Sequence, residues 1–265
     1  MATSEQETKS FDSGAPVLET KNLTRRFGEL VATDDLTLEV QAGEFRSIIG
    51  PNGAGKTTLF NLISGALLPS EGSILFQGED VSQLPPNQRV RKGIGRSFQI
   101  TNVFGGLTVR ENVRLAAQAT LRERSVVENF FGNKDSFGDL NERTDDVLGR
   151  IGLDGRGDER ASTLAYGDRR RLEIGLVLAT DPDLVMLDEP TAGMSAEETR
   201  ATMELISDVL ADRTVLLIEH DIELVMNASD RITVLNRGSE LATGVPEAVA
   251  ANDEVQQAYL GGGVL

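Results

Sequence analysis

The stretch GPNGAGKTT, from Gly50 to Thr58, decides the fold of this 265-residue chain. An apolar, strand-like segment precedes it, and a helical pattern follows from Lys56. Glycines let the backbone wind tightly and direct its N–H groups inward, while the next helix presents its positive end to an anion. The pattern G-x-x-x-x-G-K-T in this context predicts a phosphate-binding loop; a plain glycine-rich turn is the alternative.

The side chains of this loop have distinct expected roles. Lys56 should reach the β- and γ-phosphates of a nucleotide, Thr57 should ligate Mg²⁺ through its hydroxyl, and Thr58 should lie near the α-phosphate. The nucleotide-binding candidates here are Gly50, Pro51, Asn52, Gly53, Ala54, Gly55, Lys56, Thr57 and Thr58.

A second stretch, DLVMLDEP, is an apolar segment that ends in two carboxylates, Asp188 and Glu189. A buried strand that delivers acidic residues at its C-terminal end is the expected second half of a phosphate-loop site. We expect Asp188 to hold Mg²⁺ through water, and Glu189 to orient and deprotonate an attacking water. The alternative is an acidic helix cap after a strand.

Composition limits the other possibilities. The chain has no cysteine and one histidine, which excludes disulfides, thiolate metal sites and multi-histidine sites and leaves oxygen ligation, as Mg²⁺ prefers. No apolar run approaches the roughly 18 residues that span a bilayer, and the N-terminus lacks the apolar core of a signal peptide. We therefore expect a cytoplasmic protein with a mobile tail over residues 1–16.

The net charge of −16 argues against a nucleic-acid-binding role, because such a field repels the phosphate backbone. The same acidity is consistent with an ordinary acidic protein or with adaptation to a salty cytoplasm, that is, a halophilic origin. Unfolding measured against salt separates these two interpretations.

Strands and helices alternate over most of the chain, which predicts an α/β protein with a parallel sheet. Predicted strands cover 17–28, 36–50 with a break at Ala42-Gly43, 73–81, 94–99, 184–190, 214–220 and a hairpin over 231–244. Predicted helices cover 56–64, 108–124, 145–153, 168–179, 196–211 and 221–228, with a break over 129–144. The helical pattern of residues 108–164 indicates an all-helical insert.

Further motifs make the chain resemble the ATP-binding cassette (ABC) ATPases. A pentad before a helix resembles their signature motif and consists of Leu164, Ala165, Tyr166, Gly167 and Asp168. Gln99 resembles the Q-loop glutamine, residues 191–195 take the D-loop position, and Phe27 stands where an aromatic ring stacks on adenine. The resemblance implies a P-loop NTPase (RecA-like) core, an antiparallel β subdomain and a helical subdomain at about 100–165, within a domain spanning 17–265.

Within that family, GRSFQITNVFGGLTVRENV, LAYGDRRRLEIG and IEHDIELVM resemble the ATP-binding subunit of branched-chain amino acid importers, and urea or amide importers share much of the pattern. The resemblance implies ATP and Mg²⁺ as cofactors, two transmembrane permease subunits, an extracytoplasmic solute-binding protein and a location on the cytoplasmic face of the membrane. It also implies a second ATP-binding subunit, the same or different, whose signature helix completes each site. Gln99 would sense Mg²⁺ or the attacking water.

The chain departs from the commonest family pattern in its signature and D-loop. Ala165 replaces the usual serine, Tyr166 a glycine, and Asp168 a glutamine or glutamate, so the Gly167 N–H and the helix end would carry the phosphate contact. The D-loop lacks its frequent aspartate. An exporter subunit and an ABC-type switch in a soluble assembly remain alternatives.

The only histidine, His220, ends the apolar run TVLLI within LLIEHDIELVM. Taken alone, it is a polar residue that closes a strand. If that strand lies parallel to the one ending in Asp188, the C-terminal ends of both strands border the same phosphate-binding crevice. His220, which falls where the family has its switch histidine, could then donate to the γ-phosphate and help hold Glu189 and the water in line.

Overall fold

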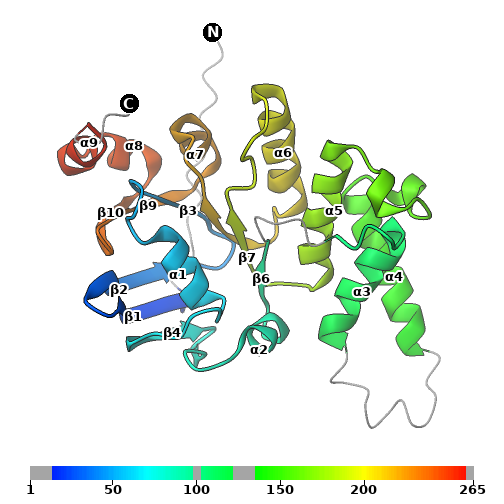
Figure 1. Ribbon diagram of the computed structural model, residues 1–265, viewed down its shortest axis with the longest axis horizontal. Coiled ribbons are helices and arrows are strands. Elements are labelled where there is room, and N and C mark those ends of the chain that lie inside the picture. Colours follow the sequence, from blue (N-terminus) through cyan, green and yellow to red (C-terminus); the bar gives the residue numbers. More distant parts are fainter. Residues whose placement is uncertain (1–13, 98–102, 122–134, 261–265) are drawn as a thin grey trace. The chain divides into compact units, whose positions relative to one another are not determined.

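The computed structural model describes residues 14–97, 103–121 and 135–260 (Figure 1). The chain forms two compact units. Of the described residues, 14–63, 67–83 and 214–260 belong to the first unit, and 64–66, 84–97, 103–121 and 135–213 belong to the second.

The first unit contains an antiparallel sheet with strand order β2-β1-β4-β5. Its strands are β1 (Leu18–Phe27), β2 (Leu30–Val40), β4 (Glu71–Phe76) and β5 (Glu79–Asp80). Leu36, Leu38 and Val40 alternate with exposed residues along β2, so one face of this strand is buried. β2 starts at Leu30 and not at Leu36 as predicted, because residues 30–33 pair with the end of β1.

The same unit contains four strands of a mostly parallel sheet. β3 (Phe45–Ile49) lies parallel to β8 (Thr214–Ile218) on one side and to β9 (Arg231–Asn236) on the other, and β10 (Ser239–Gly244) pairs antiparallel with β9. All five residues of β8 are buried, as expected of a strand covered on both faces. The parallel α/β prediction is confirmed.

Helices of this unit follow the strands. They are α1 (Lys56–Ile63), α7 (Ile222–Ala228), α8 (Pro246–Ala250) and α9 (Asp253–Leu260). The sequence did not predict α8 and α9, which pack against β10 (Figure 1). Val249 of α8 and Val255 of α9 join the buried cluster around Ile232 and Val234, so tertiary packing stabilises two helices that are too short to be stable alone.

The second unit carries two parallel strands and five α-helices among its described residues. The strands are β6 (Ile94–Arg96) and β7 (Leu184–Asp188), and the helices are α2 (Pro86–Arg91), α3 (Val109–Leu121), α4 (Asp135–Arg150), α5 (Tyr166–Ala179) and α6 (Ala196–Val209). Helices α3, α4 and α5 contact one another (Figure 1) and bury Val113, Val147, Leu148 and Leu172.

The break predicted over 129–144 is wrong for its second half. Helix α4 begins at Asp135 and continues without interruption through Gly138 and Asn141. Leu140 and Val147 are buried on one face of the helix, and the Thr144 hydroxyl donates back to the Leu140 carbonyl at 2.7 Å. Packing of this apolar face outweighs the weak helix propensity of glycine and asparagine.

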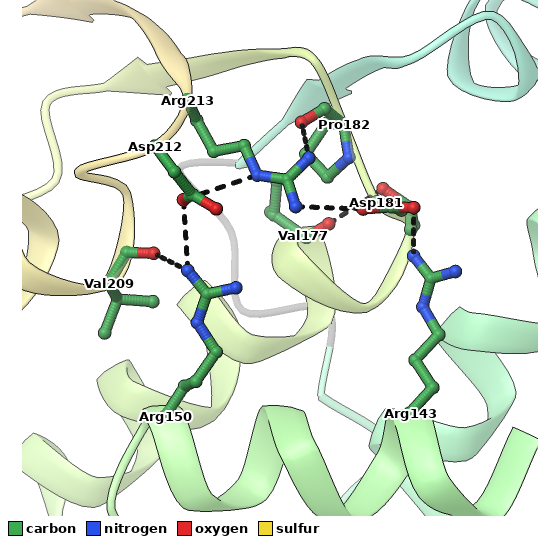
Figure 2. A network of polar contacts seen from close by, with 9 residues as sticks. Arg143, Arg150, Val177, Asp181, Pro182, Val209, Asp212 and Arg213 are labelled. Carbon is green, nitrogen blue, oxygen red and sulfur yellow. Dashed lines mark hydrogen bonds and ion pairs between the residues drawn. The ribbon is translucent and has the colours of Figure 1, made fainter. Parts of the chain in front are cut away.

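A polar network joins α4 to the chain turns that follow α5 and α6 (Figure 2). Asp181, in a left-handed conformation with φ 55°, pairs with Arg213 at 2.9 Å and with Arg143 at 3.5 Å. Asp212 pairs with Arg150 at 3.1 Å, and Arg150 also donates to the Val209 carbonyl at 2.6 Å. The network therefore fixes one side of α4 to two turns of the same unit.

Candidate nucleotide site

The loop between β3 and α1 has the backbone that the sequence predicts for a phosphate loop. Gly50 and Gly55 have φ values of 150° and 101°, which L side chains rarely adopt. A Cβ at Gly50 would lie 2.2 Å from the Leu235 carbonyl oxygen, and one at Gly55 would lie 2.5 Å from that of Ala32. Any side chain at these two positions would displace backbone, so both must be glycine.

Lys56 is held over this loop. Its ammonium donates to the Gly50 carbonyl at 2.6 Å and to the Pro51 carbonyl at 3.2 Å, and the side chain is buried. The positive charge is therefore kept at the loop before any phosphate arrives. Thr57 is exposed in the first turn of α1, where backbone N–H groups point out of the helix end, and Thr58 is half-buried.

The first unit also brings His220 to the loop's edge of the sheet. β3 and β8 run parallel with Ile48 opposite Ile218, so Gly50 and His220 each lie two residues beyond this pair, at the same end of the two strands. The imidazole is exposed, and the backbone N–H of His220 donates to Glu219 Oε2 at 3.2 Å. Its predicted position at the carboxyl end of a buried core strand agrees with the structure.

Phe27, the predicted adenine platform, ends β1 in the same unit. Its side chain is 43% exposed, and the Arg25 guanidinium lies 4.6 Å from the ring centroid. The exposure leaves the ring accessible to a planar ligand, and adenine stacking remains a prediction.

In the second unit, β7 delivers the predicted acidic pair. All five strand residues are buried, and Asp188 is 2% exposed. One carboxylate oxygen, Oδ2, accepts from Arg96 Nη2 at 2.9 Å, whereas the buried Oδ1 has no hydrogen-bond partner among the described residues. A buried carboxylate oxygen without a partner is a suitable ligand for a hard cation, so Asp188 fits its predicted role toward Mg²⁺.

Glu189 directly follows the strand and has a left-handed backbone, with φ 48°. Such a conformation is unfavourable for a residue with a long side chain and is often found at functional sites. The next residue, Pro190, accepts a hydrogen bond from Arg170 Nη2 at 2.5 Å through its carbonyl. This contact anchors the backbone of the turn that carries the half-buried Glu189.

The predicted signature pentad overlaps the start of α5. The helix begins at Tyr166, two residues before the predicted start at Asp168. Ala165 is the N-cap, so Tyr166, Gly167 and Asp168 form the first helical turn. Leu164 is buried, whereas Ala165, Tyr166 and Gly167 are exposed together. An exposed helix N-terminus suits contact with an anion brought by another molecule.

Asp168 is engaged within its own chain, since its carboxylate accepts from Arg156. The hydrogen bond to Glu159, followed by the charges of Glu159 and Asp168, raises the pKa of Arg156.

In the D-loop, the Ser195 hydroxyl caps α6 together with Glu198. Gln99 lies outside the described residues, as do the predicted tail up to residue 13 and the break over 129–134.

Sequence reasoning missed two arginines of this site, Arg96 and Arg170. Arg96 ends a short apolar strand, and a charged residue in such a strand signals a buried counter-charge nearby. Arg170 lies in the run Arg169-Arg170-Arg171, where nothing distinguishes a solvated arginine from one that contacts Pro190. Among the described residues, no cluster of three or more histidine or acidic side chains forms a ready-made metal site.

The fold and the loop define a P-loop nucleotide-binding protein. The family model described as ABC transporter matches residues 33–192, more than half of the chain, and the chain belongs to that family and is an ATPase of this class. A second model, described as branched-chain amino acid ATP-binding cassette transporter, matches residues 240–264.

The chain is similar along nearly its whole length to known members. It is 42% identical over 250 residues to the high-affinity branched-chain amino acid transport ATP-binding protein LivG of Escherichia coli (strain K12), covering 93% of this chain and 98% of LivG. It is 40% identical to BraF of Pseudomonas aeruginosa, with the same coverage. A crystal structure of an ABC transporter ATP-binding cassette in its ADP conformation superposes with a TM-score of 0.79 at 28% identity, covering 94% of this chain and all of that one.

In the part of the chain that the structure describes, no helix has both the length and the apolar character needed to cross a membrane.

Proposed function

We propose that this chain is the ATP-hydrolysing subunit of an ABC importer that takes up branched-chain amino acids. The observation that carries the proposal is its full-length similarity to LivG and BraF, together with the separate match of the C-terminal segment 240–264. That segment contains all but the first residue of β10, together with α8 and α9, and lies outside the region that the general ABC model covers. The C-terminal match thus supports the solute assignment from a part of the chain that the ATPase assignment does not use.

The proposed chemistry is phosphoryl transfer from ATP to water. The loop N–H groups, the end of α1 and Lys56 bind the phosphates, because this loop is shaped for an anion and already holds a cation. Thr57 and Asp188, with Gln99, would hold Mg²⁺, which when bound neutralises charge on the β- and γ-phosphates. Glu189 orients the attacking water and takes its proton, and His220 donates to the γ-phosphate.

A second ATP-binding subunit completes the proposed site. The exposed Ala165, Tyr166 and Gly167 at the start of α5 would face the γ-phosphate held by the partner, and the partner's equivalent helix would face the ATP of this chain. Because Ala165 has no hydroxyl, the Gly167 N–H and the helix end make this contact. The subunits close on ATP and separate after hydrolysis.

Two transmembrane permeases and an extracytoplasmic solute-binding protein are the remaining proposed partners. The chain would then work at the cytoplasmic face of the membrane, bound through the permeases. A transporter for urea or amides, an exporter and a switch in a soluble assembly are the competing functions, and they differ in partners and solute rather than in the ATPase site.

Reconstitution tests the proposal. The chain, its two permeases and its binding protein are placed in proteoliposomes with Mg²⁺-ATP on the side of the ATPase, and uptake of labelled leucine, isoleucine and valine is measured. ATP-dependent uptake that excess unlabelled leucine suppresses and that Glu189→Gln abolishes is expected. Stimulation of ATPase activity by urea or an amide instead would contradict the solute, and stable purification with soluble proteins alone would contradict the transporter.

A further inference from the structure

Arg96 and Asp188 form an ion pair between the ends of two adjacent parallel strands. β6 and β7 are in register with Arg96 opposite Met186, two residues before Asp188. Arg96 Nη2 donates to Asp188 Oδ2 at 2.9 Å, and the side chains are only 12% and 3% exposed. Arg96 Nη1 also donates to the Ser64 hydroxyl at 3.0 Å, so the guanidinium is anchored on a second side.

Because this ion pair is buried, its electrostatic interaction is strong. Solvent and salt screen a buried ion pair weakly, and removing one partner leaves an uncompensated charge in a poorly polar environment. The Arg96 guanidinium carries a permanent positive charge, and its contacts with Asp188 and Ser64 fix the orientation of the Asp188 carboxylate. The same contact uses only one carboxylate oxygen, and Oδ1 has no hydrogen-bond partner among the described residues.

We propose that Arg96 is a positioning residue that acts as a built-in counter-ion of Asp188. It thereby raises the Mg²⁺ concentration at which the site is half filled. Its charge repels a divalent cation and competes with it for the carboxylate, so that Asp188 binds the metal firmly only when the phosphates of ATP supply further ligands and negative charge. Arg96 thereby links metal binding to nucleotide binding. This inference rests on the proposed role of Asp188 toward Mg²⁺.

The central variant is Arg96→Gln, which removes the charge and keeps a side-chain donor. In a Glu189→Gln background, which prevents turnover, the Mg²⁺ concentration at half-maximal thermal stabilisation by ATP should fall by about tenfold. Binding of Mn²⁺ without nucleotide, followed by electron paramagnetic resonance, should tighten in parallel. Without metal, Arg96→Gln should unfold at a lower temperature than its parent, because Asp188 is then buried without a counter-ion.

Two further variants separate charge from structure. Arg96→Lys keeps the charge but cannot reproduce the forked contact, so the Mg²⁺ midpoint should fall by no more than about two- to threefold. Arg200→Gln removes a positive charge from an exposed position of α6 and should change nothing. An unchanged midpoint in Arg96→Gln, or an equal decrease in Arg96→Lys, would overturn the proposal.

Ser64→Ala covers the case in which Arg96→Gln does not fold. It keeps both charges and removes one anchor of Arg96, so the Mg²⁺ midpoint should fall by about two- to threefold; no change would count against the proposal. Asp188→Asn tells this inference apart from the proposed function. If Asp188→Asn leaves the midpoint unchanged, the metal role of Asp188 is wrong; if it raises the midpoint while the Arg96 variants do nothing, only the counter-ion role is wrong.

Discussion

Arg170 of α5 donates a hydrogen bond to the carbonyl of Pro190 at 2.5 Å, and Pro190 directly follows Glu189. The same guanidinium donates to Glu173 Oε2 at 2.5 Å, one turn further along α5. The helix that begins with the signature residues is therefore joined to the turn that carries the proposed catalytic base, within one chain and one unit. Since Glu189 has a left-handed backbone, this contact stabilises an otherwise unfavourable turn.

We expect Arg170→Met to lower kcat for ATP by roughly 10- to 100-fold, because a small displacement of a catalytic group is costly. The dissociation constant for ATP should stay the same, since the phosphate loop is unchanged; steady-state kinetics and nucleotide titration measure the two quantities. Arg169→Met is the control, because the one contact of its side chain among the described residues is a 3.4 Å hydrogen bond to the Ser162 carbonyl. A matching loss of kcat in both variants would show that Arg170 has no particular role.

His220→Ala should lose hydrolysis and keep ATP binding. The register of β3 and β8 places His220 at the same sheet edge as the loop, but Lys56 and the loop backbone do not depend on it. A decrease in kcat on the order of 100-fold is expected, as for loss of a positioned proton donor. Equilibrium binding of ATP checks the second half of the prediction, and a large loss of ATP affinity would mean that His220 is structural.

The network in Figure 2 predicts a pH-dependent contribution to stability. Partial burial opposes it, but the hydrogen bond from Arg150 and the charges of Arg213 and Arg150 lower the pKa of Asp212 below its ordinary value of 3.8. The contribution is therefore complete above that ordinary pKa and is lost as the pH falls through the lower, folded-state pKa. Asp212→Asn should cost up to about 1 kcal/mol at pH 7, since the carboxylate is largely exposed.

Urea unfolding of this variant and the wild type at a series of pH values measures the difference in unfolding free energy. The difference should shrink only below about pH 4, in line with a lowered pKa. Asp208→Asn, at an exposed position of the neighbouring helix α6, is the matched control. A difference that is independent of pH would mean that the Asp212 charge is not what stabilises this turn.

Salt should stabilise the folded chain if its acidity is an adaptation to a saline environment. The net charge of −16 implies self-repulsion in the compact state, and screening lengths fall from about 10 Å at 0.1 M salt to about 3 Å at 1 M. We therefore expect the midpoint of thermal unfolding to rise between 0.1 and 2 M KCl. Sucrose of matched osmolality controls for solvent effects; no rise with KCl would contradict the halophilic interpretation.

The sequence was sufficient for those features that follow from local pattern. Apolar runs predict β3, β7 and β8, and the carboxylates and histidine that end them fall where parallel strands require. The glycines of the loop belong to the local pattern G-x-x-x-x-G-K-T, and the structure adds that Gly50 and Gly55 approach the backbone of Leu235 and Ala32 too closely for any side chain.

What the sequence did not predict depends on contacts between distant residues. Helix α4 passes through Gly138 because its apolar face is buried, and α9 forms because Val255 joins a cluster with Ile232. Similarly, Arg96 and Asp188 are 92 positions apart, so only the pairing of β6 with β7 brings them together. No local pattern contains such information.

The central claim is that the chain hydrolyses ATP with Glu189 as the general base. Phosphate release from saturating Mg²⁺-ATP by Glu189→Gln, with the bound nucleotide identified after the reaction, tests it most directly. We predict a decrease in turnover on the order of 100-fold or more, with intact ATP retained by the protein, because the phosphate loop is unaltered. Turnover by Glu189→Gln at the wild-type rate, or ADP as the retained nucleotide, would contradict the account.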